Sequence, residues 1–146
     1  VRLDNPSLTI RKPDRPVSPL KEQPWRIILT HDASSIPADS ICLTDEFRDR
    51  TLVVENVFNY LELLKKLYNN KKIGTILLEA GGCLVREFLK AGLVDEWVGF
   101  YAPIIIGGGA DGVAPGPFLE HEAHLEQPVV NIFGDDVCIR GDICYR

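Results

Sequence analysis

A pair of glycines between an apolar run and an amphipathic stretch is the most chemically suggestive feature of this sequence. Glu79-Ala80-Gly81-Gly82 follows the apolar run 73–78 and precedes a helix-like pattern at 83–91. Glycines at the end of a strand let a ligand approach the backbone, and the N–H groups at a helix start attract anions. The pattern therefore favours a seat for a phosphate or diphosphate. The alternative is a tight turn that needs glycine only for its own backbone.

A second candidate for anion binding is Arg11, at the end of the polar segment Asp4-Asn5-Pro6-Ser7-Leu8-Thr9-Ile10-Arg11. A guanidinium fork is well suited to phosphate oxygens, although a single arginine in a polar arm is more often solvated. Three successive glycines, Gly107 to Gly109, indicate either a ligand-admitting flap or a loop without function. No motif of a nucleophilic enzyme occurs, so no catalytic residue is assigned.

The four cysteines, Cys42, Cys83, Cys138 and Cys144, contain no C-x-x-C pair. A structural zinc site needs convergent ligands, usually in close pairs, so no metal site is expected. Two disulfides would be the other use of four cysteines. Reduced, mostly buried thiols are preferred, because a chain of this size can be stabilised by its core alone.

Composition and charge exclude several classes of protein. Of the 146 residues 45% are hydrophobic and 25% charged, values typical of one folded domain. The 16 lysine and arginine residues against 21 acidic residues give a net charge of −5. This balance argues against nucleic acid as the main partner, which would need a basic surface. No apolar run reaches the roughly 18 residues of a membrane span, and no signal peptide is visible, so we expect no membrane partner and a cytoplasmic location.

Alternating strand and helix patterns predict an α/β fold in a single domain, with a mixed and mostly parallel sheet. Residues 1–24, rich in proline, are expected to form an extended arm. A helix of about 12–14 residues should begin after the N-cap Asn56, and a second should cover 83–91 and end before Gly92. Strands are expected at 25–30, 41–43, 51–54, 73–79, 96–102, 129–133 and 137–145, the last two as an antiparallel hairpin.

Four segments form a family pattern when they are taken in order. Residues 4–11 resemble the motif D-(D/N)-P-x-L-T-x-R, and residues 78–96 resemble (V/L)-E-(G/A)-G-x-x-L followed by F-L and L-V-D-E. Residues 102–109 resemble A-P-x-x-x-G-G, and residues 134–139 resemble G-x-D-(V/L). Together they resemble the C-terminal reductase domain of the bifunctional deaminase-reductase of riboflavin biosynthesis, whose fold is like that of dihydrofolate reductase.

This resemblance implies a three-layer α/β fold and an NADPH-dependent oxidoreductase. Its reaction would reduce the ribosyl group of 5-amino-6-(5-phosphoribosylamino)uracil to the ribitylamino form. Two alternatives stay open: a catalytically inactive paralogue that acts as a regulatory or assembly module, and a reductase of the same fold for another pterin-like substrate. The resemblance also implies a family segment before Asp4, so the domain is expected to be incomplete at its N-terminus.

Site residues follow from the same resemblance. Leu8, Arg11 and Glu79 are expected to contact the phosphorylated aminopyrimidine substrate, with Arg11 on the 5′-phosphate. Asp4 is expected near the nicotinamide. The expected cofactor segment comprises Gly81, Gly82, Cys83, Leu84, Val85, Arg86 and Glu87. Related reductases are commonly dimers, so a homodimer is expected, and the hairpin offers an apolar surface for it through Val129, Val130, Ile132, Val137 and Ile139.

Overall fold

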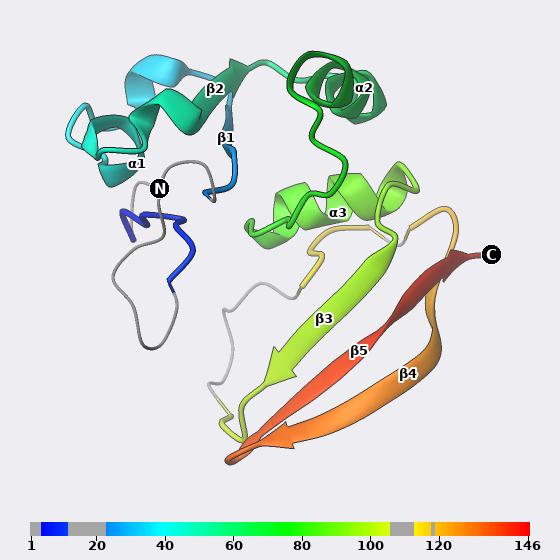
Figure 1. Cartoon of the computed structure of the whole chain (residues 1–146). Helices are drawn as coiled ribbons and strands as arrows, with labels where there is room; N and C mark the ends of the chain where they lie inside the picture. Colours follow the sequence, from blue (N-terminus) through cyan, green and yellow to red (C-terminus); the bar gives the residue numbers. More distant parts are fainter. Residues whose placement is uncertain (1–3, 12–22, 106–112, 118) are drawn as a thin grey trace. The chain divides into compact units, whose positions relative to one another are not determined.

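The computed structural model describes residues 4–11, 23–105, 113–117 and 119–146 (Figure 1). The chain divides into two compact units, Val1–Ile73 and Gly74–Arg146, each with its own strands and helices. Most of the predicted arm at 1–24 and the glycines 107–109 lie outside the described residues. The described part of the arm, 4–11, forms no regular element, and positive φ angles at Asn5 and Leu8 interrupt its extended course.

The first unit is built on a parallel pair of strands. Strand β1 (Arg26–Thr30) pairs with β2 (Thr51–Glu55), from Arg26 opposite Thr51 to Thr30 opposite Glu55. The connection contains two short 3-10 turns, η2 (Ala33–Ser35) and η3 (Arg48–Arg50), and one helical turn, α1 (Ile41–Thr44). Both strands agree with the sequence-based prediction.

The strand predicted at 41–43 is wrong, because these residues form α1. A single apolar triplet is too short to distinguish the strand period from the helical one. In the helical turn Cys42 is fully buried while Ile41 stays exposed, and the Thr44 hydroxyl donates to the carbonyl oxygen of Ser40 (3.1 Å).

Helix α2 (Tyr60–Lys71) confirms the predicted amphipathic helix, but its N-cap is three residues later than expected. The cap is Asn59, whose side chain accepts from the Glu62 N–H at 3.0 Å. Asn56 has a φ of 52° and donates its N–H to the carbonyl oxygen of Thr30 (3.0 Å), so it ends β2 instead. The two asparagines are three positions apart, and the sequence pattern alone did not show which of them caps the helix.

The second unit contains helix α3 (Gly82–Lys90) and the antiparallel sheet β3–β5–β4. Its strands are β3 (Glu96–Tyr101), β4 (Ala123–Phe133) and β5 (Asp136–Tyr145). Gly92 follows α3 with a φ of +64°, as predicted for a glycine after a helix end. The predicted hairpin is confirmed, although β4 begins earlier than expected and contains a bulge between Glu126 and Val129.

The strand predicted at 73–79 is wrong, because these residues form no regular element and most of them are exposed. Leu77 is 80% exposed although it belongs to the apolar run 73–78. A strand needs a partner for its backbone, and no strand among the described residues pairs with this segment. The α/β class is confirmed, but the single mixed and mostly parallel sheet is wrong: the described strands form a parallel pair and a separate three-stranded antiparallel sheet.

Candidate functional site

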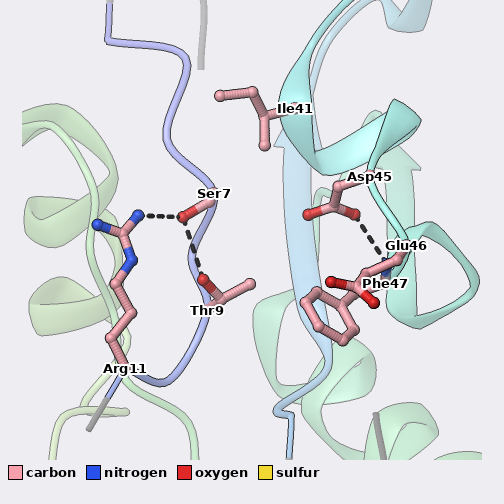
Figure 2. Close-up of a pocket in the computed structure, with 7 residues that line it drawn as sticks. All are labelled: Ser7, Thr9, Arg11, Ile41, Asp45, Glu46 and Phe47. Carbon is pink, nitrogen blue, oxygen red and sulfur yellow. Dashed lines mark hydrogen bonds between the residues drawn. The ribbon is translucent and has the colours of Figure 1, made fainter. Parts of the chain in front are cut away.

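A cavity of about 340 Å³ lies within the first unit (Figure 2). One side is formed by polar side chains of the segment 4–11, and the other by residues in and after α1. The lining residues are Ser7, Thr9, Arg11, Ile41, Asp45, Glu46 and Phe47. The cavity therefore combines hydroxyl and guanidinium donors with two carboxylates and an aromatic ring.

The donors form a continuous row, which we call the donor row: Ser7, Thr9 and Arg11. The Arg11 Nη2 donates to the Ser7 Oγ at 2.6 Å, and the Ser7 Oγ lies 3.2 Å from the Thr9 Oγ1. Figure 2 shows the Arg11 guanidinium turned back toward Ser7. Among the described residues Arg11 has no carboxylate partner. Such a row is suited to an anion with several oxygens, because hydroxyl and guanidinium groups both donate.

Hydrogen bonds to other parts of the first unit hold this polar segment in place. The Asn5 Oδ1 accepts from the Ile41 N–H (2.8 Å), and the Cys42 Sγ donates to the Pro6 carbonyl oxygen (2.9 Å). The side-chain amide of Gln23 accepts from the Ile10 N–H (2.8 Å) and donates to its carbonyl oxygen (3.3 Å). These contacts place the donor row without any pairing between strands.

The Asp45 carboxylate in the cavity wall is neutralised by a buried arginine. Arg26 donates from Nη1 to Asp45 Oδ2 at 2.6 Å and from Nη2 to Oδ1 at 2.8 Å. This hydrogen-bonded pair lowers the pKa of Asp45 and raises the pKa of Arg26. Burial raises the pKa of the neighbouring Cys42 thiol. Asp45 is thus charged but compensated at neutral pH, and it offers little repulsion to an anion on the donor row.

In the second unit, the start of α3 has the features of an anion seat. Its N-cap, Gly81, has no side chain, and a Cβ there would meet nothing within 4 Å. The N–H groups of Gly82 and Cys83 have no acceptor among the described residues, whereas Leu84 and Val85 donate to the Gly81 carbonyl oxygen. Two unpaired N–H groups beside open space, at the positive end of a helix, suit a phosphate group.

Arg86 lies one turn into α3 and ties a loop of the same unit to the helix. Its Nη2 donates to the Pro117 carbonyl oxygen (3.0 Å), and its Nη1 contacts the Glu87 carboxylate (3.1 Å). Gly116 has a φ of +125°, and a Cβ there would lie 2.9 Å from the Arg86 Nε. That Nε is buried and has no partner in the described residues. Glycine is therefore required for the loop to pass over the guanidinium, and the Nε is buried where the loop passes.

A comparison with known families gives a match along almost the whole chain. Residues 1–139 match the family described as the RibD C-terminal domain. The chain belongs to this family. This RibD C-terminal domain is 32% identical over 108 residues to the riboflavin biosynthesis protein RibD of Mycobacterium tuberculosis, covering 74% of the chain and 29% of that protein. It is 35% identical over 95 residues to RibD of Escherichia coli, covering 62% of the chain and 26% of that protein.

Solved structures agree with this assignment at the level of the fold. The RibD C-terminal domain aligns with Acinetobacter baumannii RibD with a TM-score of 0.77 at 23% identity. The alignment covers 97% of this chain and 44% of that one. The chain thus spans less than half the length of each of these relatives, and it shares the α/β fold of part of RibD.

The residues expected to bind ligands in this RibD C-terminal domain are distributed over both units. Arg11 lines the cavity, whereas Leu8 is half-buried outside its lining and Asp4 is exposed in a turn. Glu79 is exposed in the irregular segment before α3. No group of three or more His, Cys, Asp or Glu residues in the described ranges is arranged to hold a metal ion. No helix there is long and apolar enough to cross a membrane.

Sequence reasoning missed several residues of the cavity. Thr9 and Ser7 stand two and four positions before Arg11, and in an extended segment this spacing would have placed all three side chains on the same side. Asp45, Glu46 and Phe47 come from the other wall, more than 30 residues away. No sequence signal joins them to the segment 4–11, because their proximity depends on how α1 packs.

Proposed function

We propose that this RibD C-terminal domain is an NADPH-dependent reductase of riboflavin biosynthesis. The substrate we propose is 5-amino-6-(5-phosphoribosylamino)uracil, whose ribosyl group is reduced to a ribityl group. Membership of the RibD C-terminal domain family supports the reductase class. The single structural observation that carries the substrate assignment is the donor row of Ser7, Thr9 and Arg11 in an open cavity.

The donor row would hold the 5′-phosphate of this substrate. Arg11 supplies charge and paired N–H donors, and the two hydroxyls supply neutral donors at its side. The exposed Glu46 carboxylate on the facing wall is able to accept from hydroxyl or amino groups of the substrate. In the proposal Leu8 and Glu79 also contact the substrate, as the family motif implies.

The start of α3 fits the phosphates of a dinucleotide. Gly81 provides open space, and Gly82 and Cys83 provide N–H groups that have no acceptor among the described residues; Arg86, one turn into the helix, belongs to the same proposed segment. The proposed cofactor segment continues through Leu84, Val85 and Glu87, and Asp4 would lie near the nicotinamide. NADPH, when bound, supplies the hydride that reduces C1′ of the opened sugar. The residues of this chain bind and orient the two reactants, which is where a hydride-transfer protein contributes most of its effect.

The test of this function is oxidation of NADPH by the protein with the phosphorylated aminopyrimidine and with its dephosphorylated form. The loss of NADPH absorbance should depend on the substrate, and kcat/KM should be at least about 10-fold higher for the phosphate ester. Titration of NADPH fluorescence should give saturable binding. A folded protein that neither binds nor oxidises NADPH would instead support an inactive module, and equal rates on both substrates would refute the phosphate assignment.

We also propose that the domain acts as a homodimer in the cytoplasm. The four cysteines are free thiols, which suits a reducing compartment. Val130 and Ile132 of β4 lie opposite Ile139 and Val137 of β5, so the four share one sheet face. Ile132 is 75% exposed on this face. An exposed apolar surface of this kind is typical of a protein contact.

Replacing Ile132 with glutamate is expected to weaken this homodimer at least about 10-fold, because a charge would be buried in an apolar contact. Sedimentation velocity over a range of concentrations measures the dissociation constant. The structure separates Val129 from the apolar surface expected from the sequence, because Val129 lies opposite Arg140 on the other face of the sheet. Since Val129 is also exposed, Val129→Glu is the matched control. A wild-type protein that stays monomeric at high concentration would contradict the dimer.

A further inference from the structure

Arg26 is a buried arginine whose contacts converge on the candidate substrate site. It is only 3% exposed, and it stands at the first position of β1. We propose that Arg26 is a positioning residue, which holds the donor row in place through the Ser7 carbonyl oxygen. This inference rests on the proposed function, because the row has to bind the substrate phosphate for its position to matter.

All five N–H donors of the Arg26 guanidinium are used. The two bonds to Asp45 leave three further donors, each of which reaches a different segment. The Nη1 donates to the Ser7 carbonyl oxygen (2.9 Å), the Nη2 to the Cys42 carbonyl oxygen (2.9 Å), and the Nε to the Thr51 Oγ1 (3.0 Å). One planar group thus joins the polar segment, α1 and the start of β2.

The bond to Ser7 differs from the other contacts that hold the polar segment. Asn5 and Pro6, which form hydrogen bonds to α1, precede the donor row in the sequence. Ile10, which is bound by Gln23, lies near the end of the row but is not a member of it. Two described contacts reach the backbone of a member of the row, both at the Ser7 carbonyl oxygen: the Arg26 Nη1 at 2.9 Å, and the Cys42 Sγ at the much longer distance of 3.9 Å. Since the Ser7 hydroxyl bonds to both Thr9 and Arg11, a shift of the Ser7 backbone moves the hydroxyl that orders the other two.

Arg26 itself does not line the cavity, so it cannot act by touching the substrate. Its carboxylate partner Asp45 does line the cavity, directly across from the row. The bidentate pair therefore fixes one wall while the Nη1 bond to Ser7 fixes the other. A planar fork makes this connection with fixed angles, whereas a lysine ammonium would supply a charge without the fork.

The test is Arg26→Lys in the full chain, assayed with the phosphorylated aminopyrimidine and NADPH. Lysine keeps a positive charge beside Asp45 but loses the simultaneous bonds to Ser7 and Cys42. We expect the KM for the phosphorylated substrate to rise about 10-fold, while kcat and the KM for NADPH change less than about two-fold. A merely structural role would instead lower the amount of active protein, which reduces the apparent kcat and leaves both KM values unchanged.

A second measurement tests whether Arg26 acts through the row. In the Arg11→Met background, Arg26→Lys should raise the KM for the phosphorylated substrate less than about two-fold, because the main donor it positions is already gone. Full additivity of the two substitutions would overturn the inference. Ser40→Ala is the matched control: it removes the hydrogen bond from a buried serine to the Pro37 carbonyl oxygen in the same unit and changes no contact of the polar segment.

A further variant covers the case in which Arg26→Lys does not fold. Thr51→Val removes the acceptor of the Arg26 Nε, together with the hydroxyl's own bond to the Cys42 carbonyl oxygen (2.7 Å), and leaves the Asp45 pair intact. It should raise the KM for the phosphorylated substrate about two- to three-fold and leave the KM for NADPH unchanged. The possible failures are distinguishable. If the wild-type protein does not oxidise NADPH with this substrate, the proposed function fails, and if Arg11→Met leaves that KM unchanged, the proposed phosphate site fails. If Arg11→Met raises the KM and neither Arg26→Lys nor Thr51→Val does, only the positioning role fails.

Discussion

Replacing Arg11 with methionine is expected to raise the KM for the phosphorylated aminopyrimidine about 100-fold, while the KM for NADPH stays within about two-fold of the wild-type value. Hydrogen bonds to a charged group contribute roughly 1.5–3 kcal/mol each, and loss of about 3 kcal/mol corresponds to about 100-fold in affinity. Arg11 bonds only to the Ser7 hydroxyl among the described residues, so its removal leaves no buried charge unpaired. The effect should therefore concern binding and leave stability almost unchanged.

Steady-state kinetics with the phosphorylated and dephosphorylated substrates measures this effect. The KM for the dephosphorylated form should be unaffected by Arg11→Met, because that substrate has no phosphate for Arg11 to bind. Arg48→Met serves as the control: Arg48 is an exposed arginine of the same unit that does not line the cavity. If Arg11→Met raised the KM for both substrates equally, Arg11 would not bind the phosphate.

Replacing Asp45 with asparagine is expected to lower the free energy of unfolding of the first unit by about 3–5 kcal/mol. The substitution leaves the Arg26 guanidinium buried without a counter-charge, and such a charge is costly away from water. Since a small domain is stable by only about 5–15 kcal/mol, the melting temperature should fall by roughly 10 °C or more. Urea denaturation followed by circular dichroism measures the change.

Glu62→Gln is the control for this second prediction. Glu62 pairs with Lys65 at 2.9 Å, but both side chains are more than half exposed, and exposed pairs of this kind contribute little. We expect no measurable change in its melting temperature. If Asp45→Asn were as stable as the Glu62→Gln variant, the Arg26–Asp45 pair would not support the fold.

The same pair makes stability depend on pH in a defined direction. The hydrogen bond from Arg26 lowers the pKa of Asp45 in the folded state below its ordinary value of 3.8. The stabilisation by the ionised carboxylate is therefore fully present above about pH 5 and is lost as the pH falls below about 4 through the folded-state pKa. The stability difference between wild type and Asp45→Asn should accordingly be constant at neutral pH and shrink in acid.

The sequence was informative wherever a pattern was local and long enough. Helix α2, helix α3 and the β4–β5 hairpin each combine a hydrophobic periodicity with residues that mark where the element ends or turns. All three elements are present in the structure. The segments 41–43 and 73–79 had apolar composition without such a combination. Their structure depends on whether a neighbouring strand is present, which no local pattern reports.

The sequence likewise showed some residues of the candidate site and not others. Arg11 and the pair Gly81-Gly82 were found because their side-chain chemistry, or its absence, is visible in the residue itself. Arg26 was not found, since an arginine inside an apolar strand pattern gives no sign of its partners. Asp45 lies 19 residues from Arg26, and the Ser7 carbonyl lies 19 residues from it in the other direction. Only packing brings the three together.

The contacts that hold the segment 4–11 limit the sequence changes that it can accept. A strand in a ladder is held by repeating bonds, so a shift by two residues recovers most of them. Here each contact joins one particular main-chain atom to one particular side chain: Pro6 to Cys42, Ser7 to Arg26, and Ile10 to Gln23. Inserting or deleting a single residue would break every later contact and restore none. The segment should therefore accept many changes of side chain at Ile10 and hardly any change of length.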